Sequence, residues 1–69
     1  MKTPTKATAP ETGKIAYYLT NGKTYDILNQ YGPTNECGWG FNIINDEGME
    51  IFCIENVCSH LSDLNWKLS

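Results

Sequence analysis

The stretch that decides the fold is WGFNIINDEGMEIFCI, residues 39–54. Two runs rich in β-branched and aromatic residues, 39–44 and 49–54, flank the turn-prone tetrad NDEG. This pattern is typical of an antiparallel hairpin. Successive side chains of a strand point to opposite faces, so Cys53 and Phe52 lie on different sides of the second run. Neither side is polar throughout. This favours a small barrel, in which bent strands pack one face on the core and use the other face for a second contact.

Two runs before this hairpin predict another one. Residues 14–20 (KIAYYLT) and 23–28 (KTYDIL) are separated by Asn21-Gly22. Asn-Gly between such runs is a strong hairpin signal, because both central residues of a type I′ turn take positive φ. The next ten residues, 29–38 (NQYGPTNECG), are rich in turn-forming types and predict a long loop.

The sequence after the central hairpin predicts a turn and a last strand. Residues 55–62 (ENVCSHLS) place three apolar side chains at spacings that one helical turn brings together, which indicates a 3₁₀ or short helical turn. Residues 64–68 (LNWKL) alternate again. We therefore predict an all-β fold, a small five-stranded barrel over residues 14–69 with one short 3₁₀ or helical turn before the last strand.

The first thirteen residues differ from the rest of the chain. They contain two prolines and four threonines and, apart from the initiator, no large apolar residue. Such a segment buries too little surface to offset the entropy lost on ordering. We expect residues 1–13 to form a flexible N-terminal arm.

Charge and hydropathy exclude several classes of protein. The 69 residues include five lysines and no arginine, and the net charge is −3, so we expect no direct nucleic-acid binding. No apolar run approaches the ~20 residues of a membrane span, and the start lacks the apolar stretch of a secretory signal. We expect no membrane association and a cytoplasmic location. The odd cysteine count, three, favours a reducing compartment.

The candidate soft metal ligands are Cys37, Cys53, Cys58 and His60. Three thiolates and an imidazole can form a tetrahedral zinc site, but the spacing lacks a CxxC motif. We therefore expect no metal and no cofactor, with Cys53 in the strand core and Cys58 packed under the helical turn. A nucleophilic Cys58–His60 pair would also need a cleft, an orienting group and an oxyanion site. So small a chain offers little depth for them, and we expect no enzyme activity.

Four short stretches carry a resemblance to a known family: GKTYDIL (22–28), FNIINDEG (41–48), CSHL (58–61) and NWKL (65–68). They are similar to small SH3-like proteins encoded by tailed phages and prophages, over about residues 14–69. The resemblance implies an SH3-like barrel acting in the host bacterial cytoplasm. It also implies a non-catalytic accessory protein that binds and inhibits or redirects a bacterial host protein, such as an antiviral-defence enzyme.

Aromatic residues give the main binding hypothesis. Two Trp, four Tyr and two Phe are more than a small barrel hides fully, and Tyr and Trp dominate binding hot spots. We expect Tyr25, Phe41 and one of Trp39 and Trp66 in the core. Tyr17 and Tyr18 are neighbours on an expected strand and should point to opposite faces.

The candidate partner-binding surface combines such aromatics with acids of the long loop and central hairpin. Its residues are Tyr18, Tyr31, Glu36, Trp39, Asp46, Glu47, Glu50 and Phe52. The acids would steer the protein to a basic patch on the partner. The alternative is that they only keep an exposed hairpin soluble.

Other functions remain open at this level. Proline-peptide binding is not expected, because the loop 29–38 offers only Tyr31 and Glu36 where such a groove needs several aromatics beside acids. One alternative is a homo-oligomeric structural or assembly protein that buries Phe52 and Ile54 between copies. Another is sequestration of a signalling nucleotide, for which the chain lacks arginine and a glycine-rich phosphate loop.

Overall fold

The computed structural model describes residues 3–34 and 37–69, and over these residues the protein is all-β with no α-helix. Six strands form two antiparallel sheets, ordered β2-β1-β6 and β3-β4-β5. The elements are β1 (Lys6–Thr8), β2 (Thr24–Asp26), β3 (Asn29–Thr34), β4 (Gly38–Ile44), β5 (Glu50–Ile54), the 3₁₀ turn η2 (Ser59–Leu61) and β6 (Lys67–Leu68).

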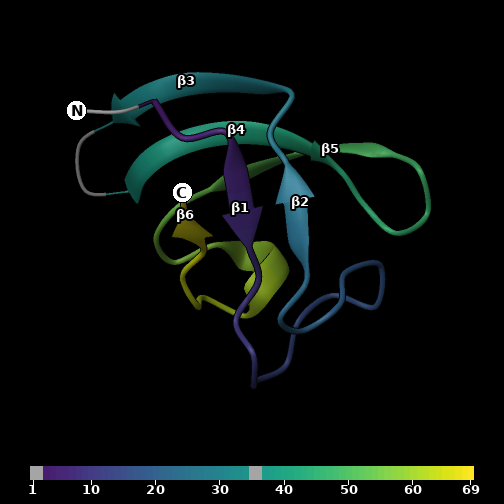
Figure 1. Ribbon diagram of the computed structural model, residues 1–69. Helices are drawn as coiled ribbons and strands as arrows, with labels where there is room; N and C mark the ends of the chain where they lie inside the picture. The colour runs from purple at the N-terminus through teal and green to yellow at the C-terminus, as the bar shows by residue number, and fades with distance from the viewer. Residues whose placement is uncertain (1–2, 35–36) are drawn as a thin grey trace.

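The two sheets are joined at a corner and do not close into a barrel. The curved sheet β3-β4-β5 lies across β1, β2 and β6 (Figure 1). Only Ile27 and Leu28 separate β2 from β3: Ile27 N–H donates to Thr5 O at 3.0 Å and Leu28 N–H to Asn42 O at 2.8 Å. The predicted all-β class is confirmed. Five strands in a closed barrel are wrong, because β5 and β6 form no ladder with each other.

The central hairpin is confirmed. In the β4–β5 register Phe41 lies opposite Cys53 and Ile43 opposite Ile51. The turn is stabilised by the buried side chain of Asn45, whose Oδ1 accepts the N–H groups of Glu47 at 2.9 Å and Met49 at 3.0 Å. The Asn45 side chain thus accepts two backbone N–H groups of the turn in place of a backbone carbonyl.

The N-terminal segment differs from the predicted flexible arm. Residues 6–8 form β1, the middle strand of its sheet, paired with β2 on one side and β6 on the other. Ala7 and Ala9 are 0% and 2% exposed. Their small side chains let the neighbouring elements approach closely, and the strand gains backbone hydrogen bonds along both edges. Composition alone misses this, because it counts large apolar residues.

Two further expectations are corrected. Residues 14–20 form turns and not a strand, because Gly22 N–H bonds to Pro10 O at 3.0 Å and the strand partner of β2 is β1. The predicted loop 29–38 instead begins with strand β3, which pairs with β4. Its glycine and proline mark a register shift between Gln30 and Pro33, and such a bulge is tolerated on an edge strand.

The C-terminal expectations are confirmed in part. The 3₁₀ turn is present at Ser59–Leu61, but the last strand covers only Lys67–Leu68. Leu64 instead forms an isolated bridge with Cys58. This closes residues 58–64 into a small loop.

The core centres on an aromatic cluster. Trp66, 3% exposed, makes edge-to-face contacts with Phe41 at 5.6 Å and Tyr25 at 6.0 Å between ring centroids. Trp66 is therefore the core tryptophan, and Trp39 is half-buried at the edge. Tyr17 is 83% exposed.

Candidate functional site

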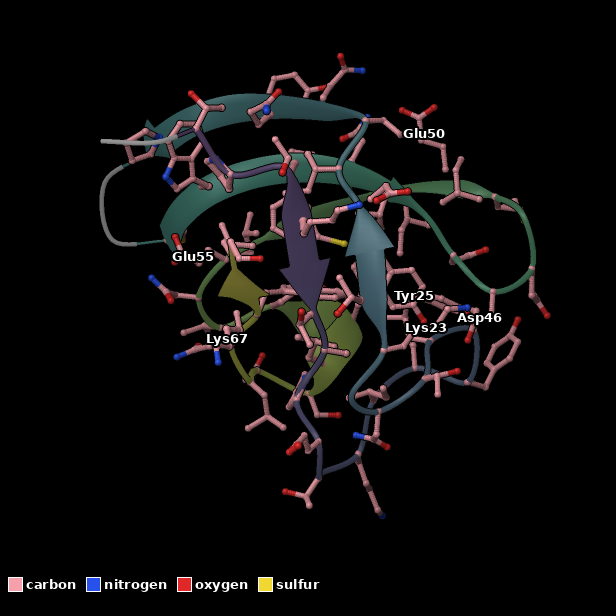
Figure 2. The ribbon with its side chains drawn as sticks, viewed as in Figure 1. Lys23, Tyr25, Asp46, Glu50, Glu55 and Lys67 are labelled. Atoms are coloured by element: carbon pink, nitrogen blue, oxygen red, sulfur yellow. The ribbon has the colours of Figure 1, made fainter. Side chains whose placement is uncertain are left out.

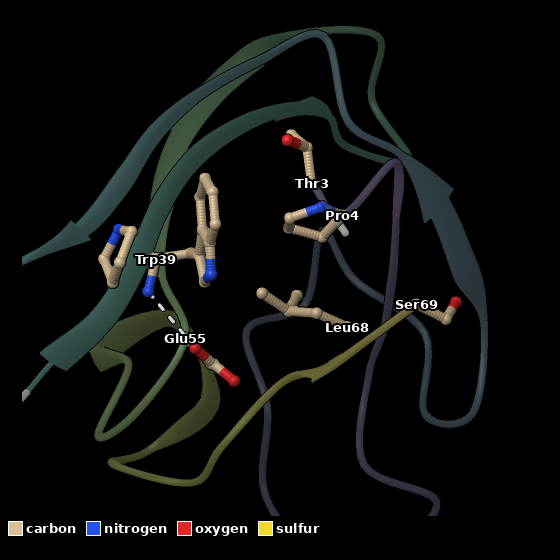
Figure 3. A pocket seen from close by; sticks show the side chains of 7 residues that line it. Thr3, Pro4, Trp39, Glu55, Leu68 and Ser69 are labelled. Carbon is tan, nitrogen blue, oxygen red and sulfur yellow. Dashed lines mark hydrogen bonds between the residues drawn. The ribbon is translucent and has the colours of Figure 1, made fainter. Parts of the chain in front are cut away.

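An apolar groove of about 510 Å³ opens where the two sheets part (Figure 3). Both sheets and the segment before β1 contribute to it. We call it the Trp39 groove, and its lining residues are Thr3, Pro4, Pro33, Trp39, Glu55, Leu68 and Ser69. Its volume lies within the range of ~300–1,000 Å³ that is usual for binding pockets.

Strand geometry places Trp39 in this groove. Trp39 shares the inward face of β4 with the buried Phe41, because alternate residues of a strand point the same way. It pairs with Pro33 across the β3–β4 ladder. At this end of β4 the inner face does not pack on a core. Open space separates it from Pro4 and Leu68 (Figure 3). The indole is therefore left half-buried as a wall of the groove.

Glu55 supplies a carboxylate to the same groove. Its Oε1 accepts the backbone N–H of Trp39 at 3.2 Å (Figure 3). Gly38 makes this approach feasible, because a Cβ at that position would overlap the Glu55 carboxylate, and its φ of +73° also favours glycine. The groove thus combines an apolar floor with one fixed acidic group among its lining residues.

A second surface lies on the outer face of β3-β4-β5. Tyr31 and Phe52 are 51% and 54% exposed, with ring centroids 5.8 Å apart. A Cβ at Gly40 would lie 3.0 Å from the Phe52 ring, so this aromatic pair covers the glycine. Ile44 extends the apolar surface and is 42% exposed. The structure therefore brings together two of the aromatics selected from the sequence, Tyr31 and Phe52.

Asp46 has an internal role in the structure. Its carboxylate accepts hydrogen bonds from Thr20 Oγ1 at 2.6 Å, Lys23 Nζ at 2.7 Å and Tyr25 OH at 2.9 Å. These bonds, that of Lys23 above all, lower the pKa of Asp46 to about 2. Asp46 ties the loop before β2 to the tip of the central hairpin.

The acids selected from the sequence are not brought together. Figure 2 shows Asp46 and Glu50 at separate places. Glu50 accepts Asn42 Nδ2 at 2.6 Å, and Glu47 is exposed at the turn. Glu36 lies outside the described residues. The steering role of these acids stays a prediction.

Tyr18 does not line the Trp39 groove, and its ring contacts Tyr17 and His60. Its hydroxyl is 2.5 Å from His60 Nδ1, and His60 Nε2 is 3.0 Å from Phe52 O. Burial raises the pKa of Tyr18. The Tyr18–His60 pair thus fastens the 3₁₀ turn between β5 and the loop before β2.

The predicted placement of Cys53 and Cys58 is confirmed, since each is 1% exposed in the core. Cys37 is half-buried. Among residues 3–34 and 37–69, no three His, Cys, Asp or Glu side chains gather as metal ligands. Within that same part of the chain, no helix has the length and apolar character needed to cross a membrane.

Sequence reasoning found Trp39 but missed the other groove residues. Pro4 falls in the expected arm and Pro33 in the expected loop, so no local pattern links them to Trp39. The useful signal was Gly38 directly before Trp39, which allows Glu55 to approach. The fold and the Trp39 groove define a small all-β protein with an apolar, acid-bordered groove. Comparisons with protein-family models, curated proteins and solved structures give no match.

Proposed function

We propose that the protein acts without catalysis, by binding a segment of another protein in the Trp39 groove. The observation that supports this is the half-buried indole of Trp39 facing Pro4 and Leu68 across open space. Tryptophan buries a large area with few rotamers, so such positions are frequent binding hot spots.

Charge favours one kind of occupant. Glu55 is the acid among the groove's lining residues, and one of its oxygens already accepts the Trp39 N–H. A lysine or arginine of the partner can pair with this carboxylate and lie over the indole ring. We therefore propose an extended partner segment with an apolar side chain next to a basic one.

The resemblance to phage-encoded proteins suggests the setting. We propose an accessory protein that occludes a functional surface of a bacterial host protein in the cytoplasm. We also propose that the strands have an SH3-like arrangement. It is supported by the element order, in which a corner joins β2 to β3, a hairpin follows, and a 3₁₀ turn precedes the last strand.

The test compares groove variants in affinity capture from bacterial lysate. Trp39→Ala should lose the partner, and Glu55→Gln should weaken its binding more at low salt than at high salt. Tyr17→Ala, which changes an exposed ring outside the groove, should retain it. Near-ultraviolet circular dichroism of the core aromatics confirms that each variant is folded. Equal capture by Trp39→Ala and the unmodified chain would refute the proposed site.

The outer aromatic pair favours a second candidate, a homo-oligomer. Tyr31 and Phe52 are each more than half exposed and their rings are in contact, and exposed apolar patches often mark interfaces. Sedimentation at two concentrations tests this. A dimer abolished by Phe52→Ser would support it, and a monomer at both concentrations would exclude it.

A further inference from the structure

The buried cysteines Cys53 and Cys58 lie in the same core cluster. Cys53 points inward from β5, opposite Phe41, and Cys58 begins the 3₁₀ turn. Both are free thiols, 1% exposed, in one core cluster. Two buried thiols in one core cluster, with only four residues between them, are candidates for an intramolecular disulfide.

The intervening segment holds the pair in place. Val57 has a φ of 55°, a left-handed conformation that is uncommon for a β-branched residue. Its N–H donates to Asn65 Oδ1 at 2.9 Å, and the N–H of Cys58 donates to Leu64 O at 2.9 Å. The chain therefore reverses at Val57 and returns Cys58 to the end of β5.

The surroundings of Cys58 favour a thiolate. The backbone groups of Ile54 and His60 and the side chain of Trp66 each help to lower the pKa of the Cys58 thiol. Trp66 Nε1 is buried and has no hydrogen-bond partner among the described residues, so a charged Cys58 sulfur would give this N–H an acceptor. The hydrogen bond from Cys53 above all lowers the pKa of Cys58 to about 5. The same bond, together with burial, raises the pKa of Cys53.

We propose that Cys53 and Cys58 form a reversible oxidation site, which closes an intramolecular disulfide when a peroxide reaches it. The division into one thiolate and one thiol suits this chemistry, because the thiolate is the form that attacks an oxidant. The site uses none of the residues assigned to the Trp39 groove.

The reaction balances with hydrogen peroxide as the oxidant. The Cys58 thiolate attacks one peroxide oxygen, a sulfur–oxygen bond forms, the O–O bond breaks, and the departing hydroxide takes a proton to become water. Cys53 then attacks the sulfenic sulfur, the S–S bond forms, and the sulfur–oxygen bond breaks. The Cys53 proton leaves with that oxygen as a second water. Two thiols are oxidised by two electrons, and an added dithiol reverses the step.

Access requires a local opening. Both cysteines are buried, and the small loop 58–64, which begins at Cys58, is closed by the Cys58–Leu64 bridge. Opening of this loop would admit the oxidant, so we expect slow oxidation that accelerates in mild denaturant. The disulfide would also enclose Glu55 within its short ring. Any consequence of this ring for partner binding by Glu55 rests on the proposed function, whereas the oxidation site itself does not.

The sequence offers a direct assay, because Glu55 lies between the two cysteines. The full chain carrying Cys37→Ser is treated with hydrogen peroxide, alkylated, and cut after glutamate without reduction. We expect peptides 51–55 and 56–69 to remain linked, the intact chain to have lost two hydrogens, and dithiothreitol to reverse both changes. With Cys53→Ser added, the link should vanish and dimedone should label Cys58.

Several outcomes would overturn the proposal. The first is that both thiols stay fully alkylatable after peroxide treatment in mild denaturant. The second is oxidation of Cys58 to sulfinic or sulfonic acid without a cross-link. The third is a disulfide that includes peptide 37–47 in the chain with all three cysteines. None of these outcomes bears on whether the reduced chain captures a partner in the groove, so failure here is distinguishable from failure of the proposed function.

Discussion

Replacing Tyr25 by Phe tests the most connected polar contact of the structure. The Tyr25 ring is 4% exposed, and its hydroxyl accepts the Thr20 N–H at 2.9 Å and donates to Asp46 Oδ1 at 2.9 Å. The substitution keeps the ring and its packing on Trp66. It therefore removes two hydrogen bonds and almost nothing else.

The expected cost follows from those two bonds. A neutral hydrogen bond contributes about 0.5–1.5 kcal/mol and one to a charged group about 1.5–3 kcal/mol. Asp46 keeps Lys23 and Thr20 as donors and stays near solvent, which favours the lower ends of both ranges. We expect a loss of about 2 kcal/mol in the free energy of unfolding. For a domain of this size that lowers Tm by roughly 8–16 °C.

The assay is urea unfolding of four chains: the unmodified protein, Tyr25→Phe, Asp46→Ala and the double variant. Because the two side chains share a bond, Tyr25→Phe should cost less when Asp46 is already Ala. Tyr17→Phe is the matched control, since Tyr17 is 83% exposed and should change stability by less than about 0.5 kcal/mol. A cost for Tyr25→Phe no larger than this control, or additive effects of the two variants, would refute the reasoning.

Three further predictions follow from backbone and charge. The pKa of Asp46 is lowered from 3.8 to about 2 in the folded protein. The contribution of Asp46 to stability is therefore complete above its unfolded pKa and is lost as pH falls through its folded pKa. The Tm difference between the unmodified chain and Asp46→Asn should shrink from pH 5 to pH 2, and a constant difference would contradict this. Gly38→Ala should destabilise more than Gly48→Ala, because both glycines have positive φ but only the first Cβ would overlap Glu55; equal costs in urea would show that this contact is unimportant. Ala7→Leu should cost about 1–3 kcal/mol by overpacking the core around the fully buried Ala7 of β1, and an unchanged Tm would instead support the flexible arm.

The parts of the fold that sequence could predict are those with local signals. Two runs rich in β-branched and aromatic residues around an Asn-Asp-Glu-Gly turn predict both strands of the β4–β5 hairpin, and Asn45 completes the turn with its own side chain. The 3₁₀ turn was likewise encoded by spacing within a few residues. Such features depend on neighbours in the chain.

The missed parts depend on distant segments. β1 is a strand because β2 and β6 offer it hydrogen bonds on both edges, and nothing in Lys-Ala-Thr itself indicates this. Only Trp39 of the groove could be selected from the sequence, because Pro4 and Leu68 reach it from opposite ends of the chain. Asp46 was selected as a surface acid, since its bond to Lys23 spans 23 residues.

The pairing of β1 with β6 also determines when the protein can finish folding. Ala7 pairs with Leu68 and Thr8 with Lys67, so one sheet joins the first strand to the last. The β4–β5 hairpin can form as soon as its own residues leave the ribosome, whereas the β2-β1-β6 sheet must wait until β6 has been synthesised. During synthesis β1 would present an unpaired edge, and its small, polar sequence is well suited to keep that nascent edge from aggregating.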